Sequence, residues 1–74
     1  MAKKQVRIGK YNVDLYALEL KSGGYLGGAT FTWDEGNATL QKQFQFDAPQ
    51  ESADDAVEHA LSQAGLRVRD DLVE

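Results

Sequence analysis

The stretch YLGGATFTW, residues 25–33, alternates two kinds of side chain with a period of two. Tyr25, Phe31 and Trp33 share one parity, whereas Leu26 and two threonines hold the other. Such alternation is typical of a β-strand that buries one face and exposes the other. The stretch therefore predicts one strand of a sheet whose aromatic face belongs to the core.

Turn signals flank this strand on both sides. KSGG, residues 21–24, offers glycines for a tight reversal, and in DEGN, residues 34–37, either Gly36 or Asn37 suits a left-handed conformation. TLQKQFQF, residues 39–46, then alternates again. Connections this short join antiparallel neighbours and leave no room for parallel crossovers. The first half of the chain is therefore predicted to be an antiparallel meander.

Two more alternating runs precede KSGG. Apolar residues alternate through residues 6–8 and through residues 11–15, on either side of a turn candidate at Gly9–Lys10. The apolar parity then changes at Tyr16. The change predicts either a bulge near Leu15–Tyr16 or a strand that is buried on both faces there, and we favour the bulge in so small a sheet.

Beyond Pro49 the apolar period becomes helical. Ser52 with Asp55 three residues later is a variant of the capping box, which marks a helix start. The residues that follow form one apolar stripe made mainly of alanines, which allow a helix to approach a sheet closely. The stripe consists of Ala53, Ala56, Val57, Ala60, Leu61 and Ala64.

These patterns together predict an α+β fold in a single domain, residues 1–74. Three or four antiparallel strands form a meander sheet, and one C-terminal helix over residues 52–64, ended by Gly65, covers one face. Leu66 and Val68 then add a short strand. We expect the helix to lie over Tyr25, Ala29, Phe31, Trp33, Leu40, Phe44 and Phe46.

Glycines inside the strand also carry a prediction. Gly27 and Gly28 have no side chain to fill the space above them, so we expect an aromatic ring or another backbone to pack closely there.

Composition excludes several classes of protein. The 74 residues are 42% hydrophobic and 27% charged, as in ordinary globular domains. Because there are no cysteines, a disulfide framework, a thiol nucleophile and a cysteine-ligated metal are excluded. The basic start lacks the apolar run of a secretory leader or membrane anchor, which predicts a cytoplasmic protein.

Charge is distributed unevenly along the chain, whose net charge is −4. Residues 1–10 carry four basic residues and no acid, whereas residues 47–74 carry eight acids against two arginines. This polarity favours head-to-tail association or attraction of a basic partner, and it permits an acidic mimic of nucleic acid. The alternative is a solvated charged surface.

The single histidine of the sequence is a candidate catalytic residue. His59 lies one helical turn after Asp55 and near Ser62 and Gln63, which resembles a nucleophile with its base. Side chains on an exposed helix face diverge, however, and no oxyanion donor is evident. The acid pairs also lack the spacing of a calcium loop. We therefore predict no enzyme, no catalytic residue, no cofactor and no metal, and a solvated histidine.

The basic start has a second interpretation, because a basic strand edge beside an aromatic residue is how sheets hold single-stranded nucleic acid. The candidate contacts are Lys3, Lys4, Arg7, Lys10 and Tyr11. Four strands followed by a helix, with VRIGKYNVDLY (residues 6–16) as the first strands, resemble the ssDNA-binding transcriptional coactivators related to positive cofactor 4. The rest of the chain lacks the dense lysine and arginine supply that phosphate contacts require.

Nearly the whole chain resembles a group of small proteobacterial proteins of unknown function. The likeness is carried by GGYLGGATFTW (residues 23–33), FQFDAP (residues 44–49) and SADDAVEHALSQAG (residues 52–65). It implies a bacterial source and a sheet followed by an alanine-rich helix, and it brings no activity with it.

A sheet covered on one face leaves the other face and both edges open. We therefore predict a non-enzymatic protein-binding module that acts through the open sheet face or an edge and forms a homodimer. The candidate partner surface is Leu26, Thr30, Thr32, Gln41 and Gln43. The alternative is an ssDNA- or RNA-binding module, or the acidic mimic.

Overall fold

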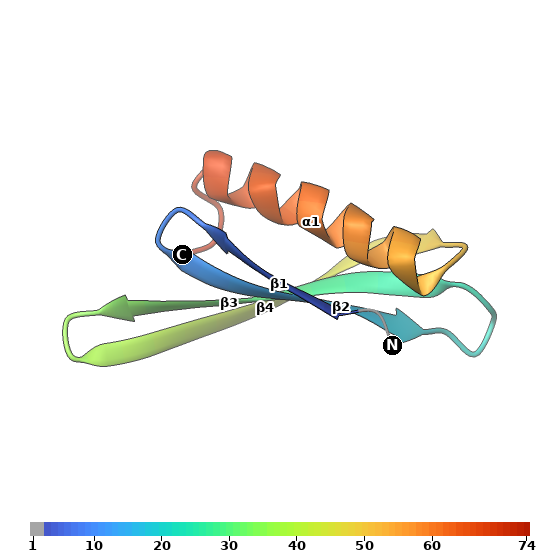
Figure 1. Ribbon diagram of the computed structural model, residues 1–74, viewed down its shortest axis with the longest axis horizontal. Coiled ribbons are helices and arrows are strands. Elements are labelled where there is room, and N and C mark those ends of the chain that lie inside the picture. The colour runs from blue at the N-terminus through green and yellow to red at the C-terminus, as the bar shows by residue number, and fades with distance from the viewer. Residues whose placement is uncertain (1–2) are drawn as a thin grey trace.

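The computed structural model describes residues 3–74, so the first two residues of the basic start lie outside it. Four strands precede one helix: β1 (Lys3–Ile8), β2 (Tyr11–Glu19), β3 (Tyr25–Glu35), β4 (Ala38–Gln50) and α1 (Ala53–Arg69). The strands form one antiparallel sheet in the order β1-β2-β3-β4, and α1 crosses one of its faces (Figure 1). The predicted α+β meander with one C-terminal helix is confirmed.

The hairpin turns follow the predicted glycines. Gly9 between β1 and β2 has a φ of 60°, and Gly36 between β3 and β4 has a φ of 63°. A residue with a Cβ is strained in this left-handed region, so glycine suits both turns.

The bulge predicted near Leu15–Tyr16 is wrong. β2 pairs with β3 in an unbroken register from Asn12 to Glu19. Leu15 is buried in the core, whereas Tyr16 lies on the opposite face with its ring against Gly28. The change of parity is therefore explained by apolar side chains on both faces of one regular strand. This was the alternative to the bulge.

The register shifts instead between β3 and β4. Gly27 lies opposite Phe46, but Tyr25 lies opposite Gln50, so four steps along β4 match two along β3. Pro49 falls in this irregular segment, where a strand tolerates a residue without an amide hydrogen.

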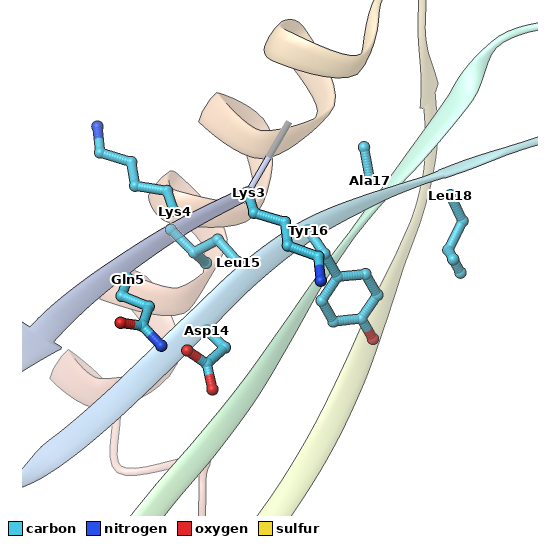
Figure 2. A pocket seen from close by; sticks show the side chains of 8 residues that line it. All are labelled: Lys3, Lys4, Gln5, Asp14, Leu15, Tyr16, Ala17 and Leu18. Atoms are coloured by element: carbon cyan, nitrogen blue, oxygen red, sulfur yellow. The ribbon is translucent and has the colours of Figure 1, made fainter. Parts of the chain in front are cut away.

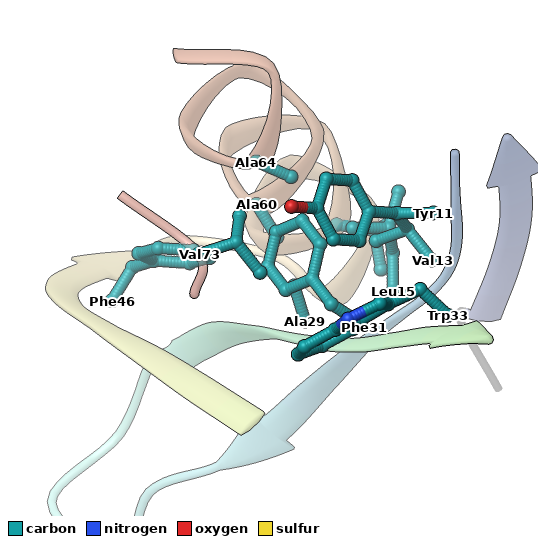
Figure 3. Packing of buried hydrophobic residues seen from close by; sticks show 11 residues of the cluster. Tyr11, Val13, Leu15, Ala29, Phe31, Trp33, Phe46, Ala60, Ala64 and Val73 are labelled. Atoms are coloured by element: carbon teal, nitrogen blue, oxygen red, sulfur yellow. The ribbon is translucent and has the colours of Figure 1, made fainter. Parts of the chain in front are cut away.

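Aromatic side chains from the sheet and alanines from the helix build the core (Figure 3). The Tyr11 ring packs edge-on against Phe31 and Trp33, with centroid distances of 5.8 and 5.3 Å. Val73, from the tail after α1, is also buried. The cluster consists of Tyr11, Val13, Leu15, Ala29, Phe31, Trp33, Phe46, Val57, Ala60, Ala64 and Val73.

Leu40 does not join the core that was predicted to lie under the helix. It is 38% exposed, because the β3–β4 hairpin runs past the end of α1 (Figure 1). Tyr25 and Phe44 are only half-buried. Apolar residues of β2 take a larger share of the covered face than the sequence pattern indicated.

The helix backbone lies directly against a strand glycine. A Cβ on Gly27 would overlap the carbonyl oxygen of Ala56 and lie 3.0 Å from the Ala60 Cβ. On the other face, a Cβ on Gly28 would overlap the Tyr16 ring. The close packing predicted at both glycines is confirmed.

The helix starts as predicted and ends later. The Ser52 hydroxyl caps it by accepting a hydrogen bond of 3.1 Å from the Asp55 amide. The predicted end at residue 64 is wrong, since α1 continues through Gly65 to Arg69.

Packing explains the longer helix. Val68, one turn after Ala64, packs against the core only if the helix continues, and the predicted strand through Leu66 and Val68 does not form. The end is a Schellman turn in which Asp71 has a φ of 59° and the Leu72 amide donates to the Arg67 carbonyl at 2.8 Å.

Gly65 therefore lies inside the helix, where it lowers stability. We expect Gly65→Ala to raise the free energy of unfolding by about 1 kcal/mol, because a Cβ there meets nothing within 4 Å. Urea unfolding measures the change. Gly36→Ala is the control and should destabilise, since its φ is 63°. A loss of stability on Gly65→Ala would contradict the helix boundary.

Candidate interaction surface

Within residues 3–74, no element covers the sheet face opposite α1, which we call the open face (Figure 1). Alternate positions of all four strands supply its side chains. Its centre is mostly polar, with one aromatic ring and one carboxylate, and consists of Asn12, Asp14, Tyr16, Thr30, Thr32, Gln41, Gln43 and Gln45. This face is therefore the part of the sheet that is available for contact.

One tyrosine ring is held across the open face. Tyr16 starts on β2, and its ring lies over Gly28 of β3 because that residue has no side chain. Its hydroxyl accepts a hydrogen bond from the amide of Gln43 on β4. A side chain supported by two neighbouring strands loses little further conformational freedom when a partner binds.

The structure brings most of the predicted partner surface together. Thr30 lies directly opposite Gln43, and Thr32 lies opposite Gln41, so these four side chains form one block on the open face. Leu26 is on the same face but farther along, where it is paired with Leu18. Leu18 and Tyr16 also belong to this surface, whereas the bulge expected in β2 would have turned them toward the core.

The predicted nucleic-acid contacts do not share one surface. By register Lys3 and Arg7 lie on the open face, with Lys3 opposite Tyr16. Lys4 lies on the helix side, and its Nζ is 3.9 Å from the Glu58 carboxylate. Tyr11 is 5% exposed within the core and has no ring face free for base stacking.

Lys10 belongs to a separate cluster near the tail. Its Nζ lies 2.7 Å from the Glu74 carboxylate, which also accepts a 2.7 Å hydrogen bond from the Tyr11 hydroxyl. The Lys10 hydrogen bond, and then the Tyr11 hydrogen bond, lower the pKa of Glu74. This cluster fixes the tail beside buried Val73, so Lys10 has a structural partner.

The tail cluster predicts a pH dependence of stability. Because the pKa of Glu74 is lowered in the folded state, its stabilising effect is complete above the pKa of an unfolded glutamate, about 4.3, and is lost as pH falls through the folded pKa. We expect Glu74→Gln to destabilise the protein at pH 7 and to have a smaller effect at pH 3. Urea unfolding at both pH values measures this, with exposed Glu19→Gln as the control. An equal effect of Glu74→Gln at both pH values would contradict the prediction.

An open hollow of about 700 Å³ lies at the start of β1 (Figure 2). Its lining comes from both faces of the sheet, since Tyr16 and Leu18 face one way and Lys4 the other (Figure 2). It is therefore a notch around the sheet edge, and it extends the open face past Tyr16.

The histidine considered for catalysis has a packing role. The His59 ring lies edge-on to Phe46, with centroids 6.3 Å apart, and Ser62 is exposed on α1. Among the described residues, no three histidine or acidic side chains gather as metal ligands. In the same part of the chain, no helix is long and apolar enough to span a bilayer.

The two edge strands differ in charge. β1 has Lys3, Lys4 and Arg7 among six residues. β4 has one charge between residues 39 and 46, Lys42, whose Nζ lies 5.8 Å from the Phe44 ring. The Arg67 guanidinium of α1 lies 4.2 Å from the centre of the same ring. Charged residues discourage strand pairing at an edge, so β4 is the less protected of the two.

Fold and surface together define a small α+β protein which, over residues 3–74, has one open sheet face and two edge strands, β1 and β4. Comparison with known proteins found no matching family model, no matching curated protein and no matching solved structure. The resemblance to small proteobacterial proteins therefore stays a prediction.

Proposed function

We propose that this protein is a non-enzymatic interaction module of the bacterial cytoplasm, that it binds a protein partner through the open face, and that it associates with itself through a free part of the sheet. The observation that carries the proposal is the Tyr16 ring, which lies over Gly28 and hydrogen-bonds to Gln43 beside the uncharged threonines and glutamines that β3 and β4 place on this face. Centres of protein interfaces are enriched in tyrosine and depleted in charged residues.

The surrounding side chains fit the same proposal. Threonine and glutamine form hydrogen bonds with a partner without the large desolvation cost of a buried charge. Leu18, which is 39% exposed, and half-buried Leu26 add apolar contact at one end of the face. The exposed acids of the first turn of α1, Asp54 and Asp55, lie on the helix side of the sheet and add surface charge that favours solubility.

The test uses matched baits that differ at one residue. Thr30→Arg places a long charge at the centre of the open face, and Ser62→Arg places the same charge on the exposed side of α1. We expect the wild type and Ser62→Arg to retain a shared protein partner after cross-linking in cells, and Thr30→Arg to lose it. Equal retention by Thr30→Arg would refute the open face as the binding surface.

A second candidate function is single-stranded nucleic acid binding, which one observation favours. Lys3 lies directly opposite Tyr16 on the open face, and Arg7 lies on the same strand and face. A cation beside an exposed ring suits one phosphate and one stacked base. Asp14, between them on β2, opposes phosphate binding, and for this reason the protein-binding function is preferred.

Fluorescence anisotropy with a labelled oligothymidine tests this second candidate. Two phosphate contacts predict that the logarithm of the binding constant falls with that of the salt concentration with a slope of about −1.4. The double variant Lys3→Gln/Arg7→Gln should abolish binding, whereas Lys42→Gln should preserve it. Absence of binding at low salt would eliminate the candidate.

A further inference from the structure

Self-association at the edge of the sheet has two possible sites, β1 and β4, and their charges distinguish them. If two copies of β1 paired antiparallel about its central residue Gln5, Lys3 of each copy would lie opposite Arg7 of the other. Like charges directly opposite one another destabilise a sheet. Because three of its six residues are cations and none is an acid, β1 is the edge whose charge discourages pairing with a second copy.

β4 offers a register without this conflict. When two copies pair antiparallel about Gln43, Gln41 lies opposite Gln45 of the second copy and Lys42 lies opposite Phe44. The structure already has Lys42 near a Phe44 ring within one chain, so this contact uses a cation–aromatic pair of the same kind. Pairing about Lys42 instead would place the two ammonium groups opposite each other.

Exposed apolar surface supports the same register. Leu40 is 38% exposed because α1 does not reach it, and in the Gln43 register it lies opposite Phe46 of the second copy. On the open face, the glutamines of the two copies then lie opposite one another as cross-strand pairs of side-chain amides. The irregular part of β4 around Pro49 stays outside the paired segment, residues 40–46.

We propose that the occupant of the β4 edge is a second copy of this chain, paired antiparallel with Gln43 at the two-fold axis. The proposal rests on the self-association stated under the proposed function and identifies its site. The two four-stranded sheets then form one continuous eight-stranded sheet, with both helices on one side and both open faces on the other. A partner of the dimer would meet a single polar face that contains two Tyr16 rings.

Cysteine cross-linking tests this register, because the chain has no cysteine of its own. In the proposed dimer, the two copies of residue 43 face each other with Cα atoms about 4.5–5.5 Å apart, within reach of a disulfide. Gln43→Cys alone should therefore form a covalent dimer on mild oxidation. All the substituted positions are exposed, so the fold should be kept.

Matched controls come from the same face of the same strand. In the proposed dimer, two copies of residue 45 are about 14 Å apart, which no disulfide spans. Gln45→Cys alone and Gln41→Cys alone should stay uncross-linked, whereas a mixture of the two should cross-link. Cross-linking of either control alone to the extent seen for Gln43→Cys would overturn the register.

Light scattering of the wild type distinguishes the proposed β4 site from the broader proposal that the protein associates with itself. A dimer mass together with the expected cross-links supports both self-association and the β4 site. A dimer mass without the Gln43→Cys cross-link overturns the β4 site and leaves self-association standing through another surface. A monomer mass at every concentration up to about 1 mM overturns both self-association and the β4 site. The Thr30→Arg and Ser62→Arg baits then test binding of a protein partner separately.

Discussion

Gly27→Ala is expected to lower the free energy of unfolding by about 3 kcal/mol or more, the upper end of what overpacking costs. The new methyl group would overlap the backbone carbonyl oxygen of Ala56 and crowd the Ala60 Cβ. Neither atom can move unless the whole helix shifts from the sheet, because both belong to the buried face of α1. Urea unfolding followed by circular dichroism measures the loss.

Gly28→Ala is the matched control, one residue along the same strand. Its methyl group would overlap the outer end of the Tyr16 side chain, which can rotate away on the open face. We expect a loss of about 1 kcal/mol or less, together with a change in the environment of Tyr16. Similar losses for the two substitutions would contradict the asymmetry between the covered and open faces.

Leu15→Ala is expected to cost about 2–5 kcal/mol, because it leaves a cavity in the core. Leu15 is 1% exposed and belongs to the cluster formed with Phe31 and Val13. The least stable natural domains have a free energy of unfolding of about 5 kcal/mol. A loss of this size would therefore unfold a large part of the population. Thermal unfolding should show the shift directly.

Leu18→Ala removes the same atoms from the same strand and serves as the control. Leu18 is 39% exposed on the open face, so its truncation leaves no enclosed cavity and should cost less than about 1 kcal/mol. The pair also tests the registry of β2. If Leu15 and Leu18 were on one face, as a bulge between them would require, both substitutions would be costly.

Local sequence patterns were sufficient for the order of elements. The period of two in residues 25–33, the turn glycines and the Ser52 cap each depend on residues close in sequence, and the structure confirms all three. The polar block of Thr30, Thr32, Gln41 and Gln43 was also predictable, since strand parity assigns side chains to faces.

The errors arose where distant contacts outweigh local preference. Glycine is a frequent helix terminator, yet the packing of partly buried Val68 against the core offsets the roughly 1 kcal/mol that Gly65 costs inside the helix. Tyr16 suggested a bulge because its partner, Gly28, is twelve residues away on another strand. The basic residues look like one group in the sequence, but the pleat divides Lys3 from Lys4.

By itself, the sequence determined the α+β class, the meander and the two faces of β3 and β4, because these follow from periodicity and turn chemistry over a few residues. Only the tertiary structure decided how far the helix runs, which face holds the Tyr16 ring and which two strands form the edges of the sheet. Those features depend on atoms of separate elements meeting in space, such as Gly27 beneath Ala56 and Glu74 beside Tyr11.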